Sequence, residues 1–112
     1  MKEGDVVLTA LPQANGQIKN RPALLLRVMP PYDDALLCGI STQLHQQVPD
    51  FDEPITEEDE DYQYSGLVAS SLIRLGFLAV VPQSRIAGSI GAISLTRHRR
   101  LLTTLGRYLT AK

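Results

Sequence analysis

The sequence predicts a mainly β protein of the α+β class: a small, curled antiparallel barrel with a C-terminal amphipathic helix. Strand-length apolar runs are separated by Gly, Pro and Asn turn residues, which is typical of short antiparallel strands. The tail instead carries apolar residues at helical spacing. With 112 residues, of which 44% are hydrophobic, the chain is long enough for one compact core. We therefore expect residues 1–112 to form a single domain.

Three strands are expected in the first part of the chain, at residues 5–10, 23–28 and 35–41. The first is a β-branched run that ends before Pro12 and the Asn15-Gly16 pair, which favours a turn. The second is leucine-rich, and the Pro30-Pro31 pair closes it because proline cannot continue a ladder.

The polar stretch that follows, residues 42–65, is too charged to be buried. Thr56 and Asp59 have the spacing of an N-terminal capping pair, and Pro54 precedes them, so a short, acidic, solvent-facing helix is expected there.

Three further strand-length pieces follow, at residues 66–75, 77–81 and 85–93, separated by Gly76 and by Pro82. A C-terminal helix is then predicted by an i, i+1, i+4, i+7, i+8 stripe of apolar residues, with Ser94 or Thr96 as its cap. The stripe consists of Leu101, Leu102, Leu105, Tyr108 and Leu109. His98 lies among arginines, so we expect it on the surface.

Charge is unevenly distributed although the net charge is −1. Eight of the twelve acidic residues lie within residues 50–61, and the remaining chain is basic. This acidic segment is either a solvated excursion or a negative lid over a basic groove. The single cysteine, Cys38, reads as a core residue and cannot form an intrachain disulfide or a thiolate metal site. No metal or other cofactor is expected, and no apolar run is long enough to span a membrane, so a cytoplasmic location is predicted.

Several segments, in this order, resemble the MazF/PemK family of toxin ribonucleases. They are GDVVL, KNRPALLL after a glycine loop, a strand ending in IST, then SGLV, IRL, SRIAGSIGAIS and a closing helix. The resemblance covers nearly the whole chain. It implies an SH3-like barrel, a homodimer, an antitoxin partner, and metal-independent cleavage of single-stranded RNA.

Cleavage of RNA by its own 2′-OH requires a base, an acid and a cation for the charge that gathers on phosphorus. Arg21 could supply the cation, because a guanidinium offers a planar fork of donors to two phosphate oxygens. The residues alone leave a second interpretation open, in which Arg21 ends a strand and pairs with an acid of the 50–61 segment. The resemblance favours the first, because the family's catalytic arginine lies in this Arg-Pro pair.

The family also has a catalytic threonine at the end of the third strand. Ser41 occupies that position here and keeps the hydroxyl, while Thr42 could replace it if the strand bulges. Hydroxyls bonded to nearby backbone are the alternative for both.

The candidates for RNA contact are Gln17, Lys19, Arg74 and His45. Lys19 lies two residues before Arg21, and His45 titrates in the range useful for proton transfer, although solvation in a polar loop is its alternative.

The chain departs from the family at four positions that are often charged in it: Ala69, Ser71, Ser89 and Ala92. These departures leave the general acid and base unassigned. From the resemblance we predict a type II toxin that cleaves single-stranded RNA. Because of these departures, the alternative is a non-catalytic or weakly active module that acts through a protein partner.

Overall fold

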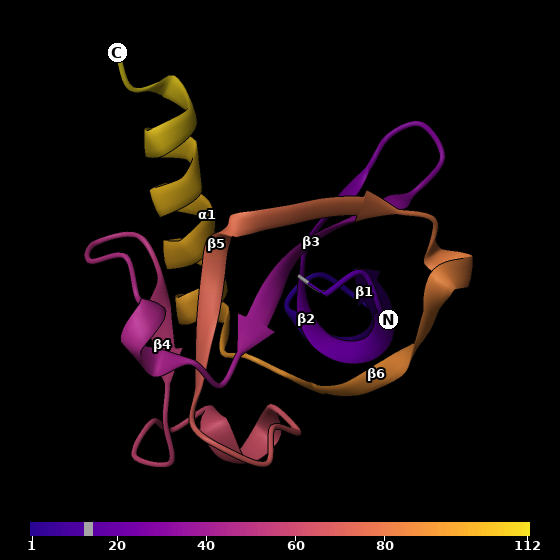
Figure 1. Cartoon of the computed structure of the whole chain (residues 1–112). Coiled ribbons are helices and arrows are strands. Elements are labelled where there is room, and N and C mark those ends of the chain that lie inside the picture. Colours follow the sequence, from indigo (N-terminus) through magenta and orange to yellow (C-terminus); the bar gives the residue numbers. More distant parts are fainter. Residues whose placement is uncertain (13–14) are drawn as a thin grey trace.

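The computed structural model describes residues 1–12 and 15–112. Within these residues, six strands form one antiparallel sheet in the order β4-β5-β3-β2-β1-β6, and helix α1 follows it (Figure 1). The strands are β1 (Asp5–Pro12), β2 (Ile18–Met29), β3 (Asp34–Ser41), β4 (Glu53–Ile55), β5 (Ser71–Val81) and β6 (Ile86–Ala92), and α1 spans Leu95–Thr110. The predicted α+β class is confirmed. The sheet is not closed into a true barrel, because β4 and β6 remain at its two edges.

The sheet curls strongly, and in Figure 1 β5 and β6 pass on either side of β1 and β2. Register shifts occur in the β1–β6, β2–β3 and β3–β5 pairings. A bulge bends its strand and increases the local twist, so the irregularities in these three pairings account for the curl.

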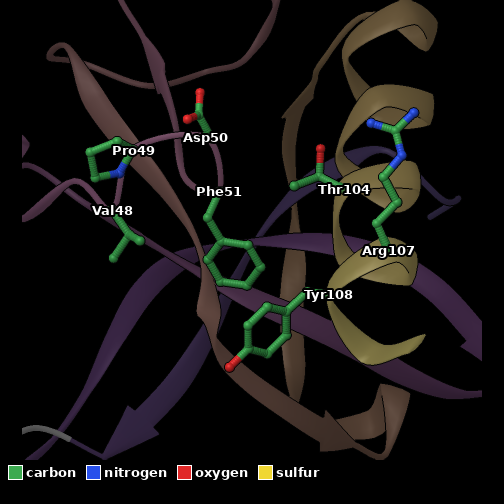
Figure 2. A pocket seen from close by; sticks show the side chains of 7 residues that line it. All are labelled: Val48, Pro49, Asp50, Phe51, Thr104, Arg107 and Tyr108. Carbon is green, nitrogen blue, oxygen red and sulfur yellow. The ribbon is translucent and has the colours of Figure 1, made fainter. Parts of the chain in front are cut away.

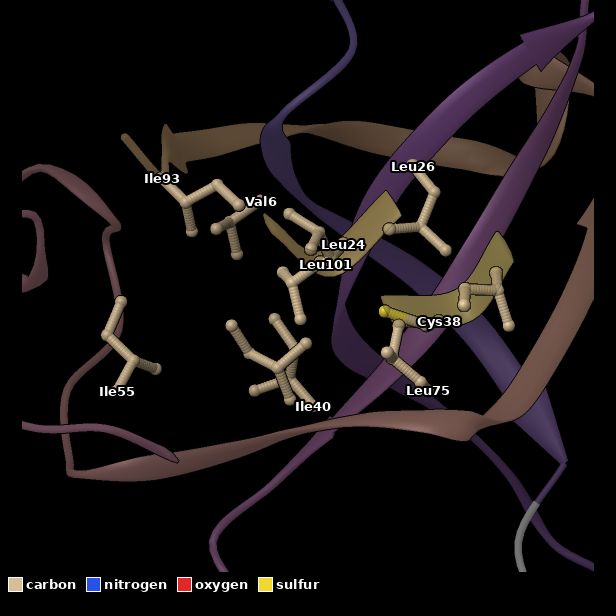
Figure 3. Packing of buried hydrophobic residues seen from close by; sticks show 11 residues of the cluster. Val6, Leu24, Leu26, Cys38, Ile40, Ile55, Leu75, Ile93 and Leu101 are labelled. Carbon is tan, nitrogen blue, oxygen red and sulfur yellow. The ribbon is translucent and has the colours of Figure 1, made fainter. Parts of the chain in front are cut away.

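Two apolar clusters fill the two faces of the sheet. Because successive side chains of a strand point to opposite faces, Leu24 belongs to one cluster and Leu25 to the other. Leu101 and Leu105 of α1 join the first cluster, which also contains Val6, Leu24, Leu26, Cys38, Ile40, Ile55, Leu75 and Ile93 (Figure 3). The second consists of Val7, Ala23, Leu25, Ala35 and Leu37. We call the side that carries α1 the helix face and the other the open face.

β2 is longer than the sequence predicted. It begins at Ile18 rather than Ala23, because the β1–β2 hairpin extends to the pair Pro12 and Ile18. Arg21 consequently lies inside a paired strand.

The sequence analysis expected Gly76 to separate two strands. In the structure it does not, because β5 runs through it. The glycine instead lies where the β3–β5 ladder is interrupted, between the pairs Gly39–Arg74 and Cys38–Leu78. A glycine between two apolar runs can mark either one strand with an irregularity or two strands with a break. Only the pairing with β3 shows that β5 is one strand.

The expected helix in the acidic segment is also absent. Glu53–Ile55 forms β4 instead and pairs with β5, and the chain then turns into the short 3-10 helix η2 (Tyr62–Tyr64). Thr56 N donates to Asp59 Oδ2 at 2.8 Å, so the capping pair stabilises a turn. The segment is not uniformly solvent-facing either, since Asp52 and Asp61 are buried.

Helix α1 begins as predicted, with Ser94 Oγ accepting a hydrogen bond from Arg97 N at 3.1 Å. Leu101 and Leu105 are buried, whereas the stripe's last two residues, Tyr108 and Leu109, are exposed. No helix of the described residues has the length and apolar character needed to cross a membrane.

His98 is buried, which corrects its predicted surface position. Its Nε2 lies 2.8 Å from the carbonyl oxygen of Leu26. His98 precedes Leu101 by three residues, so both lie on the same side of the helix and face the sheet.

Two glycines of the family-like motifs allow a close approach of backbones. A Cβ on Gly66 would collide with the carbonyl oxygen of Ile90, and one on Gly91 would collide with the backbone of Tyr64 and Ser65. Gly66 also has φ +76°, a conformation that favours glycine. The loop before β5 therefore packs directly on β6.

Candidate functional site

Arg21 and Ser41 lie across from each other on neighbouring strands. The β2–β3 ladder pairs Leu24 with Cys38 and Ala23 with Gly39. Continuing this antiparallel register by two residues brings Arg21 opposite Ser41. The pairs of the β2–β3 ladder end at Ala23 and Gly39, and the extended register sets two residues that are 20 positions apart in the sequence at facing positions of neighbouring strands.

Arg74 joins them from the next strand. It is paired with Gly39, while Ser41 is paired with Leu72, so Arg74 is the diagonal neighbour of Ser41. Such diagonal positions are about 7–8 Å apart, which long side chains can bridge. Three sequence-predicted site residues, Arg21, Ser41 and Arg74, therefore form one row across β2, β3 and β5.

This row lies on the open face. Arg21 is two residues from Ala23, which belongs to the open-face cluster, and residues two apart share a face. The arginine row and helix α1 are consequently on opposite sides of the sheet.

Gly39 lies on β3, between the strands β2 and β5 that carry the two arginines. A Cβ at this position would lie 3.2 Å from the ring of Phe77, so a larger residue would push the ring away. Without a side chain at residue 39, Phe77 packs directly against the sheet beside the row.

Arg21 is exposed, and the ion pairs found among the described residues do not include it. The acids of the 50–61 segment contact other arginines instead: Glu53 binds Arg97 and Arg100, and Asp61 binds Arg97. The alternative interpretation, a salt bridge from Arg21 to this segment, is not found in the part of the chain that the structure describes.

Ser41 is half-buried at the end of β3, and its Oγ accepts a hydrogen bond from Gln43 N at 3.0 Å. Since the oxygen acts there as an acceptor, the hydroxyl hydrogen can still be donated to a phosphate oxygen. Thr42 lies just beyond the strand and is exposed, so Ser41 is the hydroxyl that the ladder fixes.

The remaining candidates are placed less closely. Lys19 is exposed on β2, on the same face as Arg21, because it precedes it by two residues. Gln17 lies before β2, where its backbone N donates to Asn15 Oδ1 at 3.0 Å. His45 is exposed in the short 3-10 helix η1 (Leu44–Gln46). Within residues 1–12 and 15–112, the hydrogen bonds and ion pairs found do not link Gln17 or His45 to the row.

Ser71 and Ser89, two of the four positions that depart from the family, use their hydroxyls locally. Ser71 Oγ donates to the carbonyl oxygen of Ala69 at 2.8 Å, and Ser89 Oγ donates to that of Gly91 at 3.2 Å. Neither serine carries a charge, so neither replaces a base or a phosphate-binding cation.

Arg97 forms a buried ionic cluster that the sequence analysis missed. Its guanidinium lies 2.8 Å from Asp61 Oδ2, 3.0 Å from Glu53 Oε1 and 3.5 Å from Asp59 Oδ2. A signal was present, because Arg97 precedes the core residue Leu101 by four residues, and four-residue spacing places both on one helix face.

The contact between Arg97 and Asp61 shifts the pKa of both groups. Burial alone would raise the pKa of Asp61, but hydrogen bonds from Arg97 and from Ser94 N, with the positive charge of Arg97, lower it below its usual value. Burial alone would lower the pKa of Arg97, and the hydrogen bond and charge of Asp61 raise it instead. Both groups are therefore ionised near neutral pH, and they fix the acidic segment to α1.

A cleft of about 610 Å³ lies on the helix face, between residues 48–51 and the C-terminal half of α1 (Figure 2). The rings of Phe51 and Tyr108 meet there with centroids 5.0 Å apart. Its lining includes Asp50 and Arg107, but none of the predicted site residues. The cleft and the arginine row are thus separate features.

In the described residues, no group of three or more His, Cys, Asp or Glu side chains is placed to hold a metal ion. Cys38 is buried in the core, where burial raises the pKa of its thiol.

The fold and the site define a small α+β protein whose curled antiparallel sheet presents two arginines and a hydroxyl on the face away from its helix. A family model described as PemK-like, MazF-like toxin of type II toxin-antitoxin system matches residues 2–109. The protein belongs to this family, as the motifs indicated.

Among solved structures, the Mycobacterium tuberculosis toxin MazF-mt6 is similar to this chain, with a TM-score of 0.71 and 18% sequence identity. The match covers 96% of this chain and 98% of that one. At this identity the similarity supports the fold. No match is found among curated protein sequences.

Proposed function

We propose that this toxin is an endoribonuclease that cleaves single-stranded RNA by attack of the 2′-OH on the adjacent phosphate. The observation that carries the proposal is the strand register: the pair Ala23–Gly39, extended by two residues, sets Arg21 opposite Ser41, and Arg74 is the diagonal neighbour of Ser41. An exposed arginine, a hydroxyl and a second arginine on one strand-supported face suit a phosphodiester, whose transition state gathers negative charge on the phosphoryl oxygens.

Each residue of the row has a distinct role in this reaction. Arg21 donates its guanidinium fork to the non-bridging oxygens, and Ser41 donates its hydroxyl hydrogen to the same phosphate. Arg74 binds the phosphate backbone, which supplies much of the affinity for RNA. These residues hold and stabilise the phosphate rather than remove a proton.

The reaction also needs proton transfers. The 2′-oxygen bonds to phosphorus while its proton passes to a base, and the bond from phosphorus to the 5′-oxygen breaks while that oxygen receives a proton. Lys19, on the same face as Arg21, and His45, in the turn region after Ser41, are the titratable groups that we propose for these transfers. Every step is completed by protein side chains and water, so the proposed reaction uses no metal.

A second candidate function is a non-catalytic or weakly active module that acts through a protein partner. The uncharged residues Ser71 and Ser89 favour it, because they occupy positions that are often charged in the family. Their hydroxyls are bonded to backbone carbonyl oxygens. The two candidates differ in one measurable property, the cleavage of RNA by the purified protein.

A single-turnover cleavage assay on a long unstructured RNA, with chelator present, tests the proposal. Wild type should cleave, and Arg21→Ala should not. Arg21→Lys should also be poor, since lysine keeps the charge but loses the fork. Circular dichroism checks folding, and Arg99→Ala, an exposed arginine of α1, is the matched control. Absence of cleavage by wild type would favour the non-catalytic module, and full activity of Arg21→Ala would refute the assigned site.

We further propose that the toxin is a homodimer and that the helix face forms part of the interface. Leu78 and Val80 on β5 are 41% and 58% exposed, and Tyr108 and Leu109 at the end of α1 are 66% and 67% exposed. Contiguous exposed apolar surface usually marks an interaction site. Phe51 connects the two groups, because it contacts Tyr108 and lies against Gly76, two residues before Leu78. Light scattering at micromolar concentration should give twice the chain mass, and a monomer would contradict the proposal.

A further inference from the structure

The row on the open face continues beyond Arg21 towards β6. Thr9 on β1 is paired with Arg21 on one side and with Ile86, the first residue of β6, on the other. Arg85 immediately precedes Ile86. Neighbouring strands are about 4.8 Å apart, so the start of β6 lies roughly 10 Å from Arg21 across the sheet.

Thr9 connects these elements through its side chain. The residue is completely buried, and its Oγ1 donates a hydrogen bond to the carbonyl oxygen of Arg85 at 3.2 Å. Val7, two residues earlier on the same face, is an apolar core residue. A buried hydroxyl is costly unless it is bonded, and valine would fill nearly the same volume. The hydroxyl is therefore explained by the backbone position that it fixes.

Arg85 is available for a ligand. It ends the 3-10 helix η3 (Gln83–Arg85), it is exposed, and the ion pairs found among the described residues do not include it. Arg97 and Arg100, by contrast, are occupied by carboxylates. An exposed arginine whose backbone is anchored is suited to phosphate, because its guanidinium offers a planar fork of donors and the fixed backbone limits where the side chain can reach.

We propose that Arg85 binds a backbone phosphate of the RNA next to the one held by Arg21, and that Thr9 is the positioning residue that fixes Arg85. The inference rests on the proposed ribonuclease function and deepens it. It extends the RNA-binding face from β5, β3 and β2 to the exposed start of β6, whereas Thr9 on β1 is completely buried and supports this face without contacting the RNA.

The test measures binding of a single-stranded RNA that carries 2′-O-methyl groups throughout, which cannot be cleaved because the attacking hydroxyl is blocked. Affinity is measured as a function of salt concentration. For single strands, the slope of log K against log salt has a magnitude of about 0.7 for each phosphate that the protein neutralises. Arg85→Gln should lower the slope by this amount. Arg99→Gln, which removes the same charge from an exposed site on α1, should leave it unchanged.

Thr9 is tested by a double-mutant cycle. Thr9→Val should weaken binding, Thr9→Ser should restore it, and Thr9→Val combined with Arg85→Gln should bind no more weakly than Arg85→Gln alone. Additive losses would show that Thr9 acts only on general stability and would overturn its positioning role.

The outcomes also separate this inference from the proposed function. If wild type binds and Arg21→Ala weakens binding, but Arg85→Gln behaves like Arg99→Gln, only the role of Arg85 fails. If wild type shows no salt-dependent binding, both the inference and the proposed function fail. Thermal unfolding of each variant verifies that it is folded under the assay conditions.

Discussion

The Nε atom of Arg97 lies 2.8 Å from Oδ2 of Asp61, and the two side chains are each only 8% exposed. This pair joins the first turn of α1 to the acidic segment, 36 residues earlier in the chain. Because Glu53 and the carbonyl oxygen of Pro54 also accept hydrogen bonds from Arg97, the side chain links α1 to β4 as well. The acidic segment is therefore a structural partner of the helix.

Replacement of Arg97 should be strongly destabilising. Arg97→Met leaves the buried carboxylate of Asp61 without its arginine partner, and breaking a buried ion pair in this way typically costs about 3–5 kcal/mol. The matched control is Arg100→Met, whose ion pair with Glu53 is 52% exposed on the arginine side and should contribute less than about 1 kcal/mol. Urea denaturation measures both variants, and equal losses would show that burial of Arg97 does not determine the cost.

Stability should decrease in acid through Asp61. Its pKa is lowered in the folded state, so the unfolded chain, with an ordinary value of about 3.9, binds the proton first as pH falls. The stabilisation is fully present above that value and is lost as pH falls below it through the folded-state pKa. Urea denaturation between pH 7 and pH 3 should show this loss, and Asp61→Asn should show less of it. The exposed acid Glu57, replaced by Gln, serves as the control and should keep the wild-type pH dependence.

Two glycine substitutions should have opposite effects. Gly91→Ala should destabilise the protein, because its Cβ would collide with the backbone of Tyr64 and Ser65. Gly106→Ala should stabilise it by about 0.5–1 kcal/mol, because this glycine lies inside α1 and an added Cβ would meet nothing within 4 Å. Thermal unfolding is the measurement. A neutral Gly91→Ala would mean that the loop before β5 does not pack on β6 in solution.

Ser41 rather than Thr42 should supply the hydroxyl of the proposed site. Ser41→Ala should reduce single-turnover cleavage by roughly ten- to a thousandfold, by analogy with loss of one transition-state donor. Ser41→Thr should retain activity, since the hydroxyl is kept. Thr42→Ala should change little, because Thr42 lies beyond the end of β3. A large loss in Thr42→Ala with normal rates in Ser41→Ala would exchange the two roles.

The strands and the helix that have local sequence patterns could be predicted from the sequence alone. The β-branched and leucine-rich runs of β1, β2 and β3 alternate towards two buried faces, and Ser94 caps the amphipathic stripe of α1, so the α+β class could be predicted. The Arg-Pro pair and the hydroxyl at the end of β3 could be identified as candidates, because short motifs are readable without contacts.

Which distant residues meet could not be predicted from the sequence, because it depends on how the strands pair. Strand register put Arg21 opposite Ser41 and Arg74 beside it, and it brought Thr9 to Arg85. A shift of one residue in pairing would turn these side chains to the other face, and no local pattern specifies the pairing of two strands. The surface position predicted for His98 was wrong, and the burial of Arg97 was not predicted, for a related reason. Polar side chains in a helix are predicted to be exposed when their hydrogen-bond partners are unknown. The partners here are the carbonyl oxygen of Leu26 for His98 and the carboxylate of Asp61 for Arg97, and only the structure shows that they lie within hydrogen-bonding distance.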